Sequence, residues 1–304
     1  MKSSIALEPK RFPAYVSAIE SVGGQVVPLD GSVTALVWTD YADVSGLERT
    51  LDSNPQLEWV QLPFAGVDAF AGVLDRPLQF TSAKGSYAEP VAEHALALAL
   101  ALGRKLPERV KATSWGKKFA DSLFDEDVLI IGGGGIAVEL AKMLEPFRAK
   151  VIIIRKRPET PFAAKAKIFG FQEFKNELPK AKFVFLACAL TQETKFLFDS
   201  KAFAIMREDA YLVNVARGEV VDQEALFQAL VSGAIAAAAT DVTYPEPLPE
   251  ENPLWGLENL IITPHTADTM PIVTRLFSER LRVNVSAWLR GEGLTGIVDP
   301  KLGY

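Results

Sequence analysis

Three residues in the second half of the chain have the types and the order that proton transfer beside a small anion requires. Arg217 follows a short apolar run, Glu246 lies in a proline-rich connection, and His265 follows another apolar run. The planar fork of an arginine can hold a carboxylate with two parallel hydrogen bonds. A histidine can accept or return a proton near neutral pH, and a carboxylate on its other ring nitrogen fixes the tautomer and raises the imidazole pKa. The pattern predicts a site that binds a small carboxylate and moves a proton.

A glycine-rich turn lies between an apolar run at residues 127–131 and a helical stretch. Its sequence, residues 132–137, is GGGGIA and fits the pattern G-x-G-x-x-G/A. In this pattern the first glycine permits a tight turn, the second lets the backbone approach a pyrophosphate, and a small last residue lets the helix pack closely. The N-terminus of the helix also offers unpaired N–H groups to phosphates. A dinucleotide site is therefore predicted, and its residues are Gly132, Gly134, Gly135, Ile136 and Ala137.

Three consecutive cations, Arg155, Lys156 and Arg157, follow the next predicted strand. An NAD enzyme usually has an acidic residue there for the ribose 2′-hydroxyl, whereas arginine accommodates a 2′-phosphate. NADP(H) is therefore the predicted preferred cofactor. NAD(H) is the alternative if the three cations are only a solvated surface cluster.

The composition restricts the class of protein. The 304 residues are more than one core of ordinary size needs, so two domains are expected. A net charge of -6 argues against nucleic acid as a partner. The single cysteine, Cys188, cannot form an internal disulfide, and the first residues show no signal-peptide pattern, so a cytoplasmic location is predicted. The longest apolar runs fall far short of the roughly 20 residues of a membrane helix, so no membrane partner is expected. Separately, no metal ion is expected.

Short apolar runs alternate with helical stretches along the whole chain, which is typical of parallel sheets covered by helices. Strands are predicted at residues 4–7, 35–38, 58–62, 79–82, 127–131, 151–154, 183–187, 211–215, 235–240 and 260–263. Helices are predicted between them, notably at residues 12–22, 42–51, 91–102, 107–113 and 223–231. A long amphipathic helix at 270–289 is expected to return to the first domain. The predicted fold class is α/β with two doubly wound parallel-sheet domains: a Rossmann domain, 95–268, inserted into a discontinuous flavodoxin-like substrate domain, 1–94 and 269–304.

The chain resembles the D-isomer-specific 2-hydroxyacid dehydrogenases over nearly its whole length. The matching segments are NVARGEVVD at 214–222, DVTYPEP at 241–247, TPH at 263–265, FAGVD at 64–68, VAEH at 91–94 and LTQET at 190–194. The cation at position 155 and the segment ALVW at 35–38 are most similar to NADPH-using glyoxylate/hydroxypyruvate reductases. The resemblance implies a homodimer that reduces a small 2-keto acid, with glyoxylate and hydroxypyruvate as the best candidates.

The resemblance also implies the roles of individual residues. Arg217 would bind the substrate carboxylate, and Glu246 would support His265. The backbone amides of Phe64, Ala65 and Gly66 would also meet the carboxylate. The remaining implied contacts are Trp38 with the substrate, for which a buried core position is the alternative, and Thr191, Val215 and Asp241 with the cofactor. His94 is expected to be a packed or capping histidine.

Some positions depart from the family pattern. Ala189 replaces a usual proline, Gly135 replaces a larger residue, and Asp268 adds a negative charge near the predicted site. Because the chain ends at Tyr304, a phosphoglycerate dehydrogenase with a regulatory domain is a weaker alternative. Formate dehydrogenases carry glutamine at the Glu246 position, and phosphite dehydrogenase is likewise less attractive. A nucleotide-sensing binding protein, similar to the corepressors of this fold, is the alternative from another class.

Overall fold

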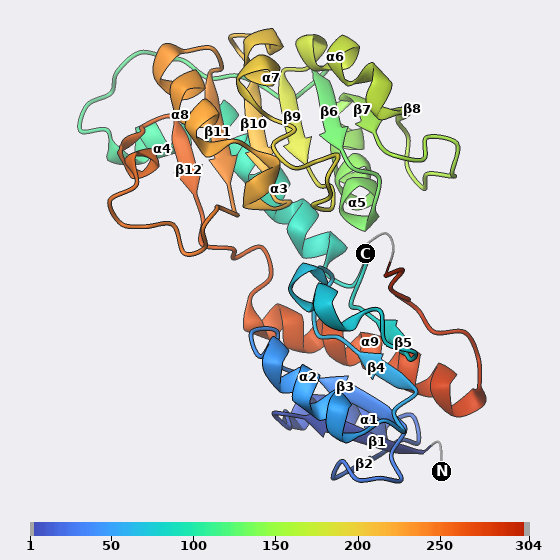
Figure 1. Cartoon of the computed structure of the whole chain (residues 1–304). Coiled ribbons are helices and arrows are strands. Elements are labelled where there is room, and N and C mark those ends of the chain that lie inside the picture. The colour runs from blue at the N-terminus through green and yellow to red at the C-terminus, as the bar shows by residue number, and fades with distance from the viewer. Residues whose placement is uncertain (1–2, 301–304) are drawn as a thin grey trace. The chain divides into compact units, whose positions relative to one another are not determined.

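The computed structural model describes residues 3–300, which form two units, each built on a parallel sheet (Figure 1). Among the described residues, unit 1 comprises 3–87 and 269–300, and unit 2 comprises Ala88–Asp268. The whole helix α3 (Ala88–Gly103) lies in unit 2, whereas the predicted division fell at residue 94. The boundaries of independently folding domains stay a prediction.

Unit 1 contains a five-stranded sheet in the order β2-β1-β3-β4-β5, with every neighbouring pair parallel. The strands are β1 (Ser4–Glu8), β2 (Gln25–Val27), β3 (Ala35–Trp38), β4 (Trp59–Gln61) and β5 (Gln79–Thr81). The helices are α1 (Pro13–Glu20), α2 (Val44–Ser53), a 3₁₀ helix η1 (Asp68–Val73) and α9 (Met270–Arg290). This strand order is that of flavodoxin-like sheets.

The long helix α9 belongs to unit 1 although it is remote in sequence from the sheet. The ring of Phe277 on α9 meets that of Tyr15 on α1 edge-on, with centroids 5.0 Å apart. Asn284, fully buried, donates to Gln61 Oε1 in β4 over 2.7 Å. A buried amide left without this acceptor would be costly, so the pair fixes the helix on the sheet. The predicted return of this helix is confirmed.

Unit 2 contains a seven-stranded sheet, all parallel, in the order β12-β11-β10-β9-β6-β7-β8. Its strands are β6 (Asp127–Ile131), β7 (Lys150–Ile154), β8 (Lys167–Phe169), β9 (Phe183–Leu186), β10 (Tyr211–Asn214), β11 (Ala237–Thr240) and β12 (Leu260–Ile262). Its remaining helices are α4 (Leu106–Lys111), α5 (Gly135–Leu144), α6 (Phe174–Glu177), α7 (Ser200–Ile205) and α8 (Gln223–Ser232). Short 3₁₀ turns lie at Glu145–Phe147, Phe171–Glu173, Leu178–Lys180, Gly218–Val220 and Pro253–Gly256.

Both faces of the seven-stranded sheet are buried, which explains the continuous apolar runs of its strands. Val128 and Ile130 of β6 pack with residues of α3 and α5, whereas Leu129 and Ile131 pack with residues of α6, α7 and α8. Figure 1 shows α7 and α8 on one face of the sheet and α3 on the other. The strand order reverses between β6 and β9, and ligands of such sheets bind beyond the carboxyl ends of the strands at this switch point.

The predicted fold class, two parallel-sheet α/β units, is confirmed. Two strands, β2 and β8, were not predicted. Each has three residues and lies at the edge of its sheet, where it is partly exposed. A short half-exposed strand carries little hydrophobic periodicity, so the sequence gives it almost no signal.

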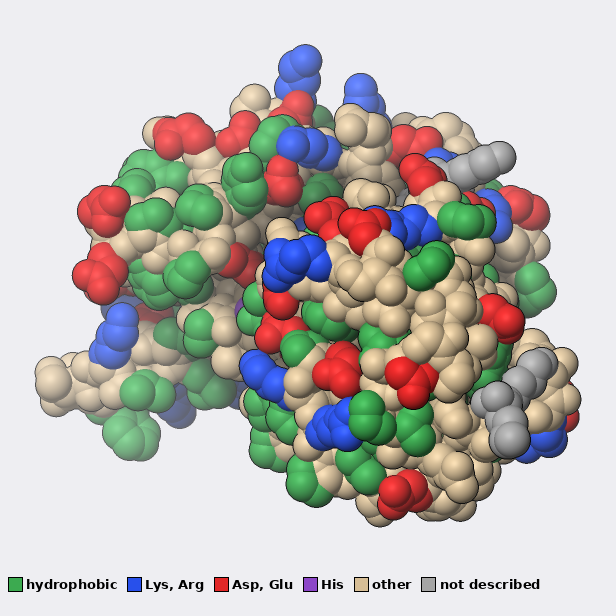
Figure 2. Space-filling view, turned by 60° about the horizontal axis from the view of Figure 1, so that its bottom comes forward, with side chains coloured by type: hydrophobic (Ala, Val, Ile, Leu, Met, Phe, Trp, Pro, Cys, Tyr) green, Lys and Arg blue, Asp and Glu red, His purple; other side chains and the backbone are tan. Residues whose placement is uncertain are grey.

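The exterior mixes side chains of every type. On the face drawn in Figure 2, acidic, basic and hydrophobic groups are intermingled. Among the helices of residues 3–300, none combines the length and the hydropathy that a bilayer span requires.

Candidate active site

His265 and Glu246 form a direct pair in unit 2. The Nδ1 atom of His265 donates to Glu246 Oε2 over 3.0 Å. This hydrogen bond is the largest influence on the histidine and raises its pKa above the ordinary value, while burial and the positive charge of Arg217 lower it. Since Nδ1 carries the bonded proton, Nε2 is the atom left for proton exchange.

The backbone fixes both members of this pair. His265 lies in the left-handed region at φ +52°, and its N–H donates to the carbonyl of Asp241 over 2.8 Å. Glu246 Oε1 accepts from the N–H of Thr243 over 2.9 Å. Burial alone raises the pKa of Glu246, but the bonds from His265 and Thr243 outweigh it and bring the pKa below its ordinary value. The carboxylate is thus held ionised against the imidazole.

Asp241 organises the turn that carries His265. Its Oδ1 accepts from Thr263 Oγ1 over 2.6 Å and from the N–H of Thr266 over 2.9 Å, and its Oδ2 accepts from the N–H of Ala267 over 3.1 Å. Burial raises the pKa of this carboxyl, but hydrogen bonds, first that of His94, bring the net pKa below its ordinary value. The aspartate therefore acts as an anionic clamp on residues 263–267.

His94 links helix α3 to the same clamp. Its Nε2 lies 3.1 Å from Thr263 Oγ1 and 3.3 Å from Asp241 Oδ1. The expected packed position agrees with these contacts. No local pattern indicates that His94 contacts Asp241, because the two positions are 147 residues apart and only the fold brings them together.

Arg217 follows β10 in a turn that its neighbours define. Asn214 Oδ1 accepts from the N–H of Ala216, and Asn214 Nδ2 donates to the carbonyl of Arg217. Next in the chain, Gly218 lies so close to Thr243 that an added Cβ would be 2.1 Å from its carbonyl carbon. Only glycine lets the arginine turn pack against the segment that carries Glu246. The charge of Arg217 lowers the pKa of both His265 and Glu246, which brings the three residues into one electrostatic site.

The glycine turn joins β6 to α5 in the predicted manner. Gly132 has φ +114°, and a Cβ there would lie 2.3 Å from the carbonyl oxygen of Ala187. Around Gly134, the residue that precedes helix α5, an added Cβ would meet nothing within 4 Å. The first intrahelical bond comes from Val138 to Gly134, so the amides of residues 135–137 have no helical acceptor. Open space and unpaired donors at one helix end fit an anionic pyrophosphate.

Of the three predicted cations, Arg155 is buried and Lys156 and Arg157 are exposed. The guanidinium of Arg155 donates to the carbonyls of Pro158, Thr160 and Pro161. The Nζ of Lys156 lies 3.1 Å from Glu193 Oε1.

The other predicted cofactor contacts also lie in unit 2. Val215 is nearly buried directly after β10. The N–H of Thr191 donates to Thr194 Oγ1 over 2.8 Å, which gives its loop a fixed turn.

Burial, followed by the charge of Asp241, raises the pKa of Asp268 despite the opposing charges of His265 and Arg217. Cys188 is partly buried, and the burial of its thiol raises the pKa of that group to about 12.

The predicted substrate contacts lie in unit 1. Trp38 is 2% exposed and belongs to the hydrophobic cluster formed with α2 and η1, as the core alternative expected. The ring of Phe64 lies between those of Tyr41 and Tyr87, with centroids 5.2 and 5.9 Å away. Ala65 and Gly66 follow it and are partly exposed. Their contact with a substrate stays a prediction.

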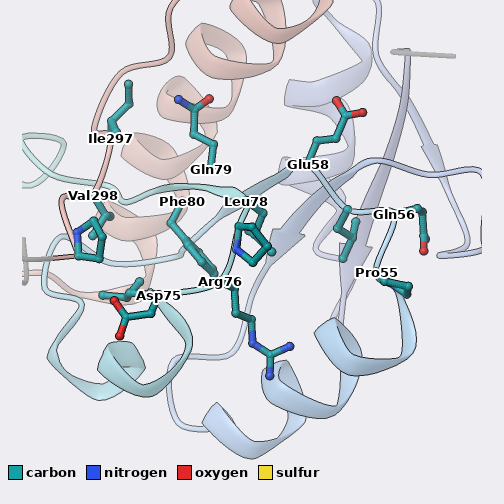
Figure 3. Close-up of a pocket in the computed structure, with 14 residues that line it drawn as sticks. Pro55, Gln56, Glu58, Asp75, Arg76, Leu78, Gln79, Phe80, Ile297 and Val298 are labelled. Atoms are coloured by element: carbon teal, nitrogen blue, oxygen red, sulfur yellow. The ribbon is translucent and has the colours of Figure 1, made fainter.

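Unit 1 also has a separate surface cavity of about 770 Å³ (Figure 3). Its charged groups are Glu58, Asp75 and Arg76, and the guanidinium of Arg76 pairs with Asp52 over 2.8 Å. None of the predicted site residues lines this cavity, and no histidine does. The cavity is therefore not the predicted active site, which lies around His265.

Comparisons with known proteins agree with this geometry. Residues 96–267 match the family described as D-isomer specific 2-hydroxyacid dehydrogenase, NAD binding domain. The human glyoxylate reductase/hydroxypyruvate reductase is 33% identical over 81% of this chain and 78% of its own. Glyoxylate/hydroxypyruvate reductase B of Citrobacter koseri is 34% identical over 71% of this chain and 69% of its own.

A solved structure is similar over the whole chain. The D-isomer specific 2-hydroxyacid dehydrogenase of Xanthobacter autotrophicus Py2, in complex with NADPH and MES, is 26% identical with a TM-score of 0.86, over 99% of each chain. The chain therefore belongs to the D-isomer-specific 2-hydroxyacid dehydrogenases, a family of NAD(P)-dependent oxidoreductases.

Proposed function

We propose that the protein is an NADPH-preferring reductase of small 2-keto acids, with glyoxylate and hydroxypyruvate as the first candidates. The observation that carries the proposal is the His265–Glu246 pair at 3.0 Å, in the electrostatic range of Arg217 and in the unit that holds the glycine turn. The reductase relatives from human and Citrobacter koseri support the choice of substrate.

Each residue of the site has a proposed role in the reduction. Arg217 binds the substrate carboxylate with its guanidinium and orients the keto group. The imidazolium of His265 donates its Nε2 proton to the carbonyl oxygen, which leaves a 2-hydroxy acid and a neutral imidazole. Glu246 stabilises the imidazolium and keeps the ring in place. The amides of Phe64, Ala65 and Gly66 remain proposed substrate contacts, whereas the buried ring of Trp38 fits the core alternative.

The cofactor is proposed to bind at the glycine turn and the cations. The amides of residues 135–137 receive the pyrophosphate, and Thr191, Val215 and Asp241 contribute the remaining contacts. When bound, the reduced nicotinamide supplies the hydride. Two exposed cations, Lys156 and Arg157, favour a 2′-phosphate, and the relative from Xanthobacter autotrophicus was solved with NADPH.

A homodimer is proposed as the working form, and an exposed apolar patch in unit 2 supports it. We define the arm patch as Leu106, Val110, Trp115, Phe119 and Phe124, all large hydrophobic residues that are at least 47% exposed. Arg109 holds the segment by donating to the carbonyls of Ser114 and Trp115. Lys105 lies over the ring of Phe119. Several large apolar side chains exposed along one segment, residues 106–124, are typical of an interface, and a second copy of the chain is the proposed occupant.

The test is the initial rate of NADPH and NADH oxidation with glyoxylate and with hydroxypyruvate. Wild type is expected to oxidise NADPH faster than NADH. Arg217→Gln is expected to lower kcat/KM by about a hundredfold, since one or two charged hydrogen bonds are lost. Arg148→Gln, which removes an exposed arginine paired with Asp125, is the matched control and is expected to keep full activity. Tight binding of NADPH without turnover of any keto acid would favour a nucleotide-sensing protein instead.

A further inference from the structure

An ion pair joins two loops on either side of the glycine turn. Lys156 follows β7 and Glu193 lies in the loop after β9, and these two strands flank β6 in the sheet. The Lys156 ammonium lies 3.1 Å from the Glu193 carboxylate, and both side chains are about half exposed, at 50% and 54%. The carboxylate of Glu193 is thus already paired with Lys156, which is one of the two exposed cations expected to bind a 2′-phosphate.

Glu193 is presented by a turn with its own hydrogen bonds. Thr194 Oγ1 donates to the carbonyl of Ala189 over 2.7 Å and accepts from the N–H of Thr191 over 2.8 Å. The N–H of Lys195 donates to the carbonyl of Thr191 over 2.9 Å. Because these bonds define the turn on both sides of Glu193, the position of its backbone does not depend on the ion pair.

Arg155 cannot take the place of Lys156 without rearrangement. Its guanidinium is engaged with three carbonyls of residues 158–161 and packs near the ring of Phe162, 5.6 Å from the centroid. Its stem fills the space beside Gly133, where an added Cβ would lie 2.3 Å from Arg155 Cδ. Arg155 thus shapes the loop and the glycine turn, and Lys156 and Arg157 are the cations that solvent reaches.

We propose that Glu193 is a specificity-determining residue for the cofactor, because a 2′-phosphate must displace its carboxylate from Lys156. The proposal rests on the NADP(H) site proposed above. Glu193 weakens the binding of 2′-phosphorylated nucleotides and leaves the binding of nucleotides without that phosphate unchanged. The site therefore binds NADPH less tightly than the two exposed cations, Lys156 and Arg157, alone would suggest.

The experiment measures dissociation constants of the whole protein for NADPH, NADH, 2′,5′-ADP and 5′-AMP. Glu193→Gln is expected to tighten NADPH and 2′,5′-ADP by about two- to fivefold, the range of an exposed ion pair. NADH and 5′-AMP are expected to bind as in wild type. The gain should shrink in about 0.5 M salt, where exposed charges are screened.

A double-mutant cycle assigns the effect to the ion pair. In a Lys156→Met background, Glu193→Gln is expected to give no further gain for NADPH. Asp125→Asn is the matched control, since its carboxylate pairs with Arg148 at 2.7 Å and is similarly exposed, but it precedes β6 at the other end of the strand.

The outcomes separate this proposal from the proposed function. An unchanged NADPH constant in Glu193→Gln, or an equal gain for NADH, would overturn the role of Glu193. A loss of NADH affinity in the same variant would also overturn it, by showing that Glu193 binds the ribose. Equal wild-type affinity for NADPH and NADH would instead overturn the cofactor preference, while the change on Glu193→Gln is measured independently.

Discussion

At the scale of single residues, the charge of Glu246 sets the pH range in which His265 can donate a proton. The hydrogen bond raises the histidine pKa, so the proposed reduction is expected to be lost as pH rises through that raised pKa. In Glu246→Gln the imidazolium loses its anionic partner, and the alkaline limb of kcat/KM for glyoxylate is expected to move to lower pH. At neutral pH, kcat/KM should decrease, and the decrease should not exceed the about 10²- to 10⁴-fold that a positioned acid contributes. An unchanged pH profile would exclude the proposed pairing from catalysis.

Individual residues could be predicted where sequence order and strand ends placed them. Arg217, Glu246 and His265 each follow a strand of one parallel sheet, so their convergence was predictable from the pattern. The burial of Arg155 was not predictable, because it depends on a bend of residues 158–161 that returns carbonyls to the guanidinium. The pairing of Lys156 with Glu193 needed the order of β7, β6 and β9, which no local pattern encodes.

At the scale of elements, two glycines of the same turn are expected to serve different purposes: Gly132 is needed for the fold, and Gly134 is needed for nucleotide binding. Gly132→Ala places a Cβ at φ +114° and 2.3 Å from a backbone oxygen, so it is expected to cost about 2–4 kcal/mol of stability. Gly134→Ala meets open space at φ -83°, so it should cost about 1 kcal/mol or less. Its methyl group would still obstruct a pyrophosphate and weaken NADPH about tenfold or more.

Thermal unfolding and NADPH titration of the two variants check this division. Each kcal/mol corresponds to about 2–4 °C in a domain of this size. The assignment of Gly134 to pyrophosphate binding fails if Gly134→Ala binds NADPH as wild type does. The assignment of Gly132 to the fold fails if Gly132→Ala unfolds at the wild-type temperature.

The turn at 263–267 depends on one carboxylate. In Asp241→Asn, one acceptor oxygen becomes an NH₂ group that faces donors, and a loss of about 2–3 kcal/mol is expected at pH 7. Because the folded-state pKa of Asp241 lies below its ordinary value, this stabilisation is complete above the ordinary pKa. It is lost as pH falls through the folded-state pKa. Unfolding temperatures of the two proteins are therefore expected to converge on acidification, and a constant difference would contradict this account.

Most elements were predictable because buried parallel strands give continuous apolar runs. The predicted strand at residues 127–131 coincides with β6, and that at 35–38 coincides with β3. The helix predicted at 91–102 begins earlier, at Ala88. The prediction missed this start because the first turn contains Glu89 and Pro90 and shows no apolar periodicity. The edge strands β2 and β8 escaped prediction for the related reason that water covers part of them.

At the scale of the whole molecule, substitutions in the arm patch test whether two copies of the chain associate. The side chains of Val110 and Trp115 are 85% and 87% exposed in the single chain, which is unusual for large apolar residues. The backbone of this segment is nevertheless held in place, because the Arg109 guanidinium donates to the carbonyl of Trp115. If a second copy covers them, Trp115→Ser removes a central aromatic contact worth about 2–4 kcal/mol. The dimer constant measured by analytical ultracentrifugation is then expected to weaken by about 30- to 1,000-fold.

A matched pair of valines separates interface from general surface effects. Val110→Ser, in the arm patch, is expected to weaken the dimer, whereas Val231→Ser, on helix α8 and 59% exposed, is expected to leave it unchanged. Both variants remove the same methyl groups from an exposed helical position, so hydrophobicity alone predicts equal effects. A wild-type protein that sediments as a monomer would contradict the dimer. A dimer that tolerates both Trp115→Ser and Val110→Ser would place the interface on another surface of the chain.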